Sequence, residues 1–184
     1  MRALKSLGIV SGVLPWIFIM TSISLSPWFN IFNDALSDLG NTNFNAPVAY
    51  IFDVGLVLSG LLAATFGLVL SIRTKSWKLR IWSIPLTLAS ANLSLIGAFN
   101  EAAGAIHSVV SVIFFLTTIV TLLLFSYVSW PLSAPALGGL SLVFGIFSAL
   151  IWMAPWPWGG VAIQETVTSA IIAIMLILLA RRFA

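Results

Sequence analysis

Six long runs of apolar residues alternate with short polar segments along the chain. The runs cover residues 7–25, 48–72, 81–99, 105–127, 137–153 and 161–180. As α-helix at 1.5 Å per residue, each would be about 25 to 37 Å long, and the hydrocarbon core of a bilayer is about 30 Å thick. The pattern therefore predicts an all-α integral membrane protein in which a single domain, residues 1–184, forms a bundle of six transmembrane helices.

The composition argues against a water-soluble domain. Hydrophobic residues make up 60% of the 184 residues and charged residues only 7%, whereas about a quarter of the residues in a soluble domain are charged. The net charge of +3 would suggest nucleic acid in a soluble chain, but in a membrane protein basic residues anchor helices at lipid headgroups. We therefore expect membrane lipids as partners and no nucleic acid. The absence of cysteine excludes thiol chemistry.

Charged residues of opposite sign fall at opposite ends of the predicted helices. The cations are Arg2, Lys5, Arg73, Lys75, Lys78, Arg80, Arg181 and Arg182, and the remaining titratable residues are Asp34, Asp38, Asp53, Glu101, His107 and Glu165. Lys and Arg concentrate in the cytoplasmic loops of membrane proteins. A six-helix chain then places both termini in the cytoplasm, crosses the cell membrane several times, and turns its acidic face to the extracytoplasmic side.

The first outer loop, residues 27–46, is the longest connection that the pattern predicts. Its apolar residues between Trp28 and Leu39 follow near-helical spacing, and Gly40 comes directly after them. This arrangement is typical of a short amphipathic helix that lies on the membrane surface and ends at a glycine. We expect such a helix over residues 28–39.

Small and polar residues form a stripe along the third predicted helix. They are Ser83, Thr87, Ser90, Ser94, Gly97 and Glu101, and their spacing of three and four residues puts them on one face. Helices in lipid associate through small residues that let two backbones approach closely. We therefore interpret this stripe as a packing surface and expect no chemistry from its hydroxyl groups.

Two acids, Asp53 and Glu165, lie within predicted membrane spans. An ionised acid in that position costs roughly 3 kcal/mol unless it is paired, hydrated or bound to a cation, and no Lys or Arg lies on the same side. Four explanations are open: the acids are protonated, they share a proton with His107, they bind a metal ion, or they line a wet pocket for a cationic or hydroxyl-rich ligand. A structural acid–histidine network is favoured slightly over a bound metal.

The best candidates for chemistry are Asp53, Glu101 and His107. Glu101 and His107 flank the short junction between the third and fourth helices, so we expect them to lie close together. Carboxylates with one imidazole suit a hard or borderline divalent cation, which is the cofactor we would expect with these three residues as ligands. One histidine cannot make a three-histidine zinc site. A second set is predicted to bind substrate: Ser37, Asp38, Asn45, Asn100 and Glu165.

Several short motifs resemble a known family. They are Ser-Pro-Trp-Phe-Asn from Ser26, Leu-Ser-Asp-Leu-Gly ending at Gly40, Asn45, Phe-Asp-Val-Gly around Asp53, and Ile-His-Ser-Val-Val-Ser from Ile106. The chain resembles the small prokaryotic membrane proteins of domain-of-unknown-function family 998, and it is distantly similar to the eukaryotic Frag1/DRAM/Sfk1 group. The resemblance implies that Ser37, Asp38, Gly40, Asn45 and His107 are characteristic positions, and it implies no particular reaction.

These observations favour a non-catalytic module that binds a lipid or a protein partner at an outward-facing carboxylate and histidine pocket. The first alternative is an intramembrane hydrolase or transferase that acts on a lipid headgroup at the outer leaflet. His107 would then be the general base, with Asp53 and Glu101 as metal ligands or orienting groups. The second alternative is a proton-coupled transporter of small molecules. No phosphate-binding glycine loop, zinc-protease motif or nucleophile elbow is present in the sequence.

Overall fold

The structure is a computed structural model that describes residues 2–184. The described chain is all-helical, and six of its helices are long and apolar enough to cross a membrane. They are α1 (Arg2–Leu25), α3 (Ala49–Arg73), α4 (Trp77–Ala98), α5 (Ala105–Val128), α6 (Pro135–Met153) and α7 (Ala162–Phe183). The short elements are α2 (Thr42–Asn45) and three 3₁₀ turns, η1 (Leu36–Gly40), η2 (Glu101–Ala103) and η3 (Trp130–Leu132). The prediction of six apolar helices is confirmed.

The helix ends differ from the ends of the apolar runs mainly at the start of α1 and α4. The first helix already begins at Arg2 and the third long helix at Trp77, four to five residues before the predicted starts at 7 and 81. Both extra segments, at the starts of α1 and α4, carry charged side chains. A helix can therefore continue beyond the apolar part of its sequence. Hydropathy marks the lipid-facing length of a helix, and its terminal turns continue into the headgroup region.

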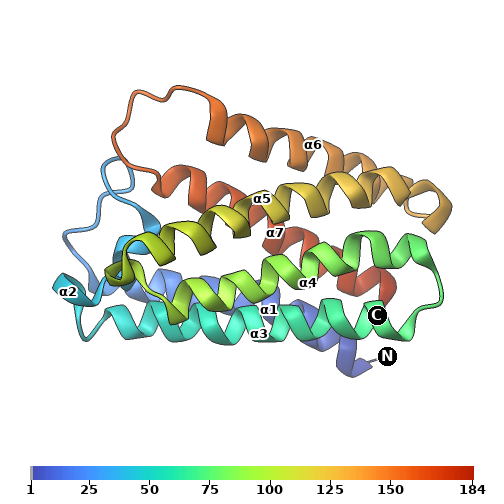
Figure 1. The fold of residues 1–184 in the computed structure, drawn as a ribbon, viewed down its shortest axis with the longest axis horizontal. Coiled ribbons are helices and arrows are strands. Elements are labelled where there is room, and N and C mark those ends of the chain that lie inside the picture. Colours follow the sequence, from blue (N-terminus) through green and yellow to red (C-terminus); the bar gives the residue numbers. More distant parts are fainter. Residues whose placement is uncertain (1) are drawn as a thin grey trace.

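The long helices run alternately up and down and pack in a ring (Figure 1). Each packs mainly against the next helix in the chain, and α7 also packs against α1, which closes the ring. Both termini and the α3–α4 connection lie at one end of the bundle, and η1, η2 and the α6–α7 connection lie at the other. All eight cations are therefore at the first end, the basic end, and all five acids and His107 are at the second, the acidic end.

The polar stripe of α4 packs tightly against α3. A methyl group on Gly60 would lie 2.5 Å from the backbone nitrogen of Ser94, and one on Gly67 would lie 2.6 Å from Oγ1 of Thr87. The Ser94 hydroxyl donates to the carbonyl of Val57 across the same contact, at 3.2 Å. Small residues thus let the two backbones approach, as lipid-embedded helices require. The packing interpretation of the stripe agrees with these contacts.

The amphipathic surface helix predicted over residues 28–39 is wrong. Turns occupy most of this segment, followed by η1, and the side chains of Leu36 and Leu39 are buried rather than lying along the surface. The reason is local: the Asn30 side chain accepts from the Phe32 N–H, and the Asp34 side chain accepts from the Asn30 N–H. Such side chains compete with the backbone carbonyls that a helix would use. The first loop therefore folds down onto the bundle.

Candidate functional site at the acidic end

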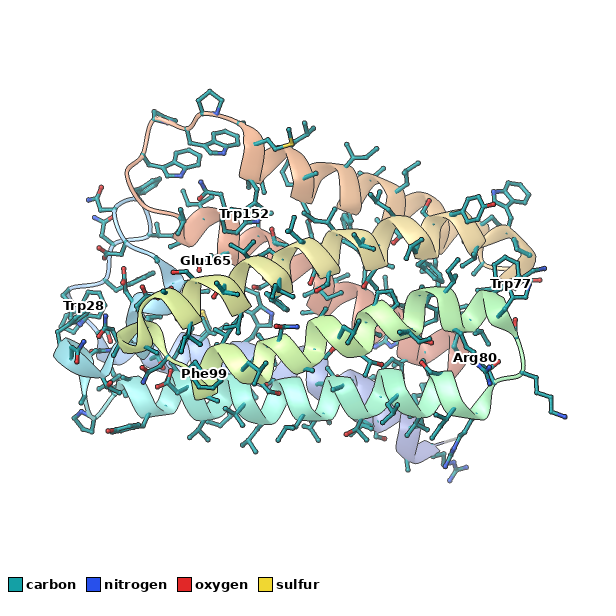
Figure 2. The ribbon with its side chains drawn as sticks, in the orientation of Figure 1. Trp28, Trp77, Arg80, Phe99, Trp152 and Glu165 are labelled. Atoms are coloured by element: carbon teal, nitrogen blue, oxygen red, sulfur yellow. The ribbon has the colours of Figure 1, made fainter. Side chains whose placement is uncertain are left out.

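The η1 turn is the centre of a polar network at the acidic end of the bundle. Its apolar residues Leu36 and Leu39 are 5% and 0% exposed and pack into the core. Its polar groups meet carboxylate and amide side chains from α2 (Asn45), η2 (Glu101) and α7 (Glu165). Figure 2 shows Glu165, Phe99 and Trp28, which come from three different parts of the chain, gathered at this end.

Glu165, in the first turn of α7, binds the start of η1. Its Oε2 accepts a hydrogen bond from the Leu36 N–H at 2.5 Å, and the Ser37 N–H faces the same carboxylate. In return, the carbonyl of Asp34 accepts from the N–H groups of Val161 and Ala162, where α7 begins. Each partner satisfies backbone donors that the other helix start leaves free. Backbone N–H groups thus take the place of a cation beside Glu165. They supply the hydrogen bonds that a buried carboxylate requires.

Asp38 closes the η1 turn on itself. Its Oδ2 accepts from the Ala35 N–H at 2.8 Å, three residues earlier. Burial raises the pKa of Asp38 above its usual value of 3.8, and the hydrogen bond from Ala35 opposes this effect. The predicted substrate-binding residue therefore holds a local turn. Its neighbour Ser37 lies beside Glu101 and helps to lower the pKa of that carboxyl group.

Asn45, at the end of α2, joins three segments of the first loop. Its amide nitrogen donates to the Leu39 carbonyl at 2.7 Å, and its Oδ1 accepts from Ser26 Oγ at 3.3 Å and from Trp28 Nε1 at 3.2 Å. These partners lie within the loop or just after the end of α1, and Asn45 itself is buried. This residue therefore fixes the path of the loop.

Asp53 and Asn100 form a second link, between α3 and the α4–α5 junction. Asn100 Nδ2 donates to Asp53 Oδ2 at 2.9 Å and lies 3.4 Å from Thr42 Oγ1. A side chain on Gly40 would collide with the Asp53 carboxylate, so the glycine allows η1 to approach this acid. Asp53 is therefore beside η1, and it binds Asn100 and not the pair formed by Glu101 and His107.

His107 and Glu101 meet as predicted. His107 Nε2 lies 2.8 Å from Glu101 Oε2, and His107 Nδ1 lies 2.8 Å from the carbonyl oxygen of Phe99. A carbonyl can only accept, so Nδ1 carries a proton; with Glu101 ionised, Nε2 donates as well and the ring is an imidazolium. The hydrogen bond from His107 holds the pKa of Glu101 below its usual value of 4.5, against the opposing effect of burial.

The residues predicted for catalysis or metal binding are divided between two contacts. Both ring nitrogens of His107 are hydrogen-bonded, and a general base or metal ligand needs one of them free. Across residues 2–184, no group of three His, Asp or Glu side chains is placed so that it could hold a metal ion. Asp53 hydrogen-bonds Asn100 whereas Glu101 pairs with His107, and metal binding by these three residues stays a prediction.

A cavity of about 40 Å³ lies directly below η1, inside the bundle. Its wall is mostly apolar, with Phe52 and Phe115 among the lining residues, and its polar positions are Ser37, Ser111, Glu165 and Ser169. A second cavity of about 40 Å³ continues toward the middle of the bundle, where it reaches Ser11 and Trp16, and Ser169 lines both. A single water molecule needs about 10 to 15 Å³, so each cavity has room for a few atoms of a ligand or for water.

Sequence reasoning missed the partners that complete the network. The Phe99 carbonyl and the Leu36 N–H are backbone groups, so the residue type at these positions does not indicate the contact. Thr42 gave no signal either, because isolated hydroxyl residues are common in loops. Ser26 stood at the start of a motif, but its bond to Asn45 was not predicted.

Comparison with known proteins gives a family and no function. The family model described as "Protein of unknown function (DUF998)" matches residues 9–182. No curated protein matches the chain, and no solved structure matches it. The matched segment contains α3, α4, α5 and α6 completely, most of α1 and α7, and every residue of the polar network. The chain therefore belongs to the DUF998 family of proteins of unknown function.

Proposed function

We propose that this protein is a non-catalytic membrane module that binds one lipid-type ligand in the cavity below η1. One observation carries the proposal: His107 is fully engaged by Phe99 and Glu101, while the amphipathic cavity beside the network holds a buried carboxylate, Glu165. A site for chemistry would expose its base to the substrate. A binding site requires an apolar wall and a few placed polar groups, which this cavity has.

The chemistry of the wall indicates the class of ligand. An apolar part would pack against Phe52 and Phe115, and a hydroxyl or ammonium group would hydrogen-bond Glu165, Ser111 or Ser169. The volume of about 40 Å³ suits the end of a chain or a small polar head and not a whole phospholipid. We therefore expect a lipid with a small hydroxyl- or amine-bearing group, of which only part enters the bundle.

The distribution of charge supports an orientation for this site. Cations at the basic end favour the cytoplasmic side, so both termini would be cytoplasmic and the acidic end would face the extracytoplasmic side of the cell membrane. The cavity below η1 would then lie at the level of the outer leaflet. The distant similarity to the Frag1/DRAM/Sfk1 group stays a prediction, as does an enzymatic alternative in which the Glu101–His107 pair opens.

The test compares a variant that fills the cavity with one that adds the same bulk elsewhere. Ser169→Leu fills the space shared by the two cavities and leaves the polar network intact. Ile174→Phe, on the lipid-facing side of the same helix, is the control. The proteins are purified from native membranes in mild detergent, and the lipids that remain bound are extracted and identified by mass spectrometry.

We expect one hydroxyl- or amine-bearing lipid at near-stoichiometric amount in the unchanged protein and in Ile174→Phe, and a loss of at least about tenfold in Ser169→Leu, as expected for a ligand excluded by steric overlap. Equal retention in all three proteins would overturn the cavity as the binding site. Turnover of that lipid, abolished by His107→Ala, would replace the proposal with the enzymatic alternative.

A further inference from the structure

A wide groove opens at the basic end, where α1, α3 and α7 meet. One part, of about 370 Å³, is lined by Leu4, Leu70, Arg73, Thr74, Leu79 and Arg182, among others. A second part, of about 410 Å³, is lined by Leu7 and Val69 and shares Leu4 and Arg73 with the first. The two parts adjoin at Leu4 and Arg73, and each is about ten times larger than the cavity below η1.

The groove has an apolar floor and a cationic rim. Leu4, Leu7, Val69 and Leu70 make the floor, and they lie toward the membrane-embedded parts of α1 and α3. The rim consists of two arginines that different helices supply, Arg73 from the last turn of α3 and Arg182 from the last turn of α7.

The Arg182 guanidinium is held in place. Its Nη2 donates to the Ser133 carbonyl at 3.1 Å, and its central carbon lies 5.5 Å from the centre of the Phe183 ring. A guanidinium carries five N–H donors, and the bond to Ser133 uses only one of them, so the others can bind a ligand. Arg80 is different: its Nε and Nη2 donate to the carbonyls of Ser71 and Thr74, which end α3, and it does not line the groove. Figure 2 shows Arg80 at this end of the bundle.

The charge of the basic end selects the sign of the ligand. All eight Lys and Arg residues lie here and all five Asp and Glu residues lie at the opposite end, so no acidic side chain neutralises Arg73 or Arg182. Basic pockets between transmembrane helices suit the headgroups of anionic lipids. Arginine in particular binds phosphate through paired N–H groups.

We propose that this groove is a binding site for one anionic glycerophospholipid. Its phosphate lies between Arg73 and Arg182, and one acyl chain follows the apolar floor along Leu4, Leu7 and Val69. The apolar floor is the reason for choosing a phospholipid over free phosphate, which would use only the rim. This site is separate from the cavity below η1, and it does not depend on the function proposed for that cavity.

The test measures lipid binding by the full-length protein in detergent micelles. Phosphatidylglycerol is titrated, and its binding is followed by native mass spectrometry and by thermal stability; phosphatidylcholine and inorganic phosphate are titrated in parallel. A ligand that binds only the folded state raises stability with concentration. We expect saturable binding of one phosphatidylglycerol, weaker binding of phosphatidylcholine, and no comparable stabilisation by phosphate.

Charge-matched variants separate this groove from general surface attraction. Arg73→Gln and Arg182→Gln are each expected to weaken phosphatidylglycerol binding about fivefold, the effect of one basic residue near an anionic headgroup. Lys75→Gln and Arg181→Gln remove the same charge at the same end, outside the groove lining, and should change binding less than about twofold. If Arg73→Gln does not fold, Arg73→Lys tests the same contact, because a lysine keeps the charge and loses the paired N–H geometry.

Three results would overturn the proposal. Equal losses in all four glutamine variants would mean diffuse attraction to the whole basic end. Equal binding of phosphatidylglycerol and phosphatidylcholine would remove the role of charge, and stabilisation by inorganic phosphate as large as that by phosphatidylglycerol would make the site a simple anion site.

Discussion

The two ends of the bundle differ in how their charged side chains are held. At the acidic end, two buried carboxylates accept from groups far away in the sequence: Glu165 accepts from Leu36, 129 residues earlier, and Asp53 accepts from Asn100, 47 residues later. At the basic end, exposed arginines donate to backbone carbonyls: Arg80 to those of Ser71 and Thr74, and Arg182 to that of Ser133. The acidic end is closed over cavities of about 40 Å³, whereas grooves of about 370 and 410 Å³ open at the basic end.

The difference follows from the chemistry of the two kinds of side chain. A short carboxylate is an acceptor that can satisfy the backbone N–H groups of a loop or a helix start, so it can hold chain segments together. Arg and Lys have long apolar stems and charged heads that extend to the headgroups, so they suit an exposed end. In this protein the acidic side chains hold loops over their end of the bundle, whereas the basic end keeps an open groove.

The largest effect is expected from Glu165→Ala. It removes the acceptor of the Leu36 N–H at a site that is buried, and we expect a loss of about 3 kcal/mol in the free energy of unfolding. Glu165→Gln keeps an acceptor oxygen and should lose less than half as much. Thermal unfolding in detergent micelles measures both, with Gln164→Ala as the neighbouring control. The comparison of the two ends fails if Glu165→Ala and Gln164→Ala are equally stable.

Asn45→Ala is expected to come next. It breaks the hydrogen bonds to Leu39, Ser26 and Trp28 at a buried position, with a loss of about 2 kcal/mol. Asn43→Ala, in the same short helix but exposed, is the matched control and should change little. The fluorescence of the protein should also shift in Asn45→Ala, because Trp28 loses its partner. An unchanged melting temperature in Asn45→Ala would show that the loop is held by its apolar contacts alone.

The acidic end should also make stability depend on pH. The pKa of Glu101 is lowered in the folded protein, so its ion pair with His107 contributes fully above pH 4.5, the usual pKa of the group, and this contribution is lost as the pH falls through the lowered value. On acidification between about pH 6 and pH 3, the melting temperature should therefore fall more, or rise less, in the unchanged protein than in Glu101→Gln. Asp38 has a raised pKa, so it makes stability increase on acidification and opposes the effect of Glu101. This contribution of Asp38 is still present in Glu101→Gln.

Melting temperatures of Asp38→Asn over the same pH range test the direction of the Asp38 effect. Removing Asp38 should make the fall on acidification steeper, because the opposing carboxyl is gone. Identical profiles for the unchanged protein and Glu101→Gln would mean that the pair with His107 does not contribute to folding stability.

The smallest effect is expected at the basic end. Arg80→Gln removes the bonds that an exposed side chain donates to the carbonyls of Ser71 and Thr74, and water can replace the bond at the half-buried Thr74, so a loss of at most about 1 kcal/mol follows. Thermal unfolding under the conditions used for Glu165→Ala gives the direct comparison. A loss as large as that of Glu165→Ala would mean that the basic end, too, is held by its charged side chains.

Some of these features could be predicted from sequence because they depend on local pattern. Six apolar runs define six helices whatever their neighbours are, and the five residues between Glu101 and His107 form only a short turn, which keeps the two side chains close. The first loop could not be predicted in this way. Its path depends on the competition of Asn30 and Asp34 with the backbone and on a carboxylate, Glu165, that arrives from the last helix.

The expected metal site shows the same limit. Asp53 has the right residue type and lies at the right end of its helix, but its direction is set by Asn100 and by the approach of Gly40. Composition places ligands in a region of the membrane, and only packing decides which of them meet. The family resemblance marked Asn45 and His107 as positions of interest, and the structure gives both a role within the network.

The contact between Glu165 and Leu36 also constrains the order of assembly. Synthesis proceeds from the N-terminus, so the first loop and five of the six long helices exist before residue 165 does. Until α7 enters the membrane and packs against α1, the start of η1 lacks its acceptor and the start of α7 lacks the Asp34 carbonyl. Insertion of the last helix is therefore the step that completes the fold. A chain interrupted before α7 would lack these hydrogen bonds at the acidic end, and the membrane's quality-control proteases would meet it with η1 unpaired.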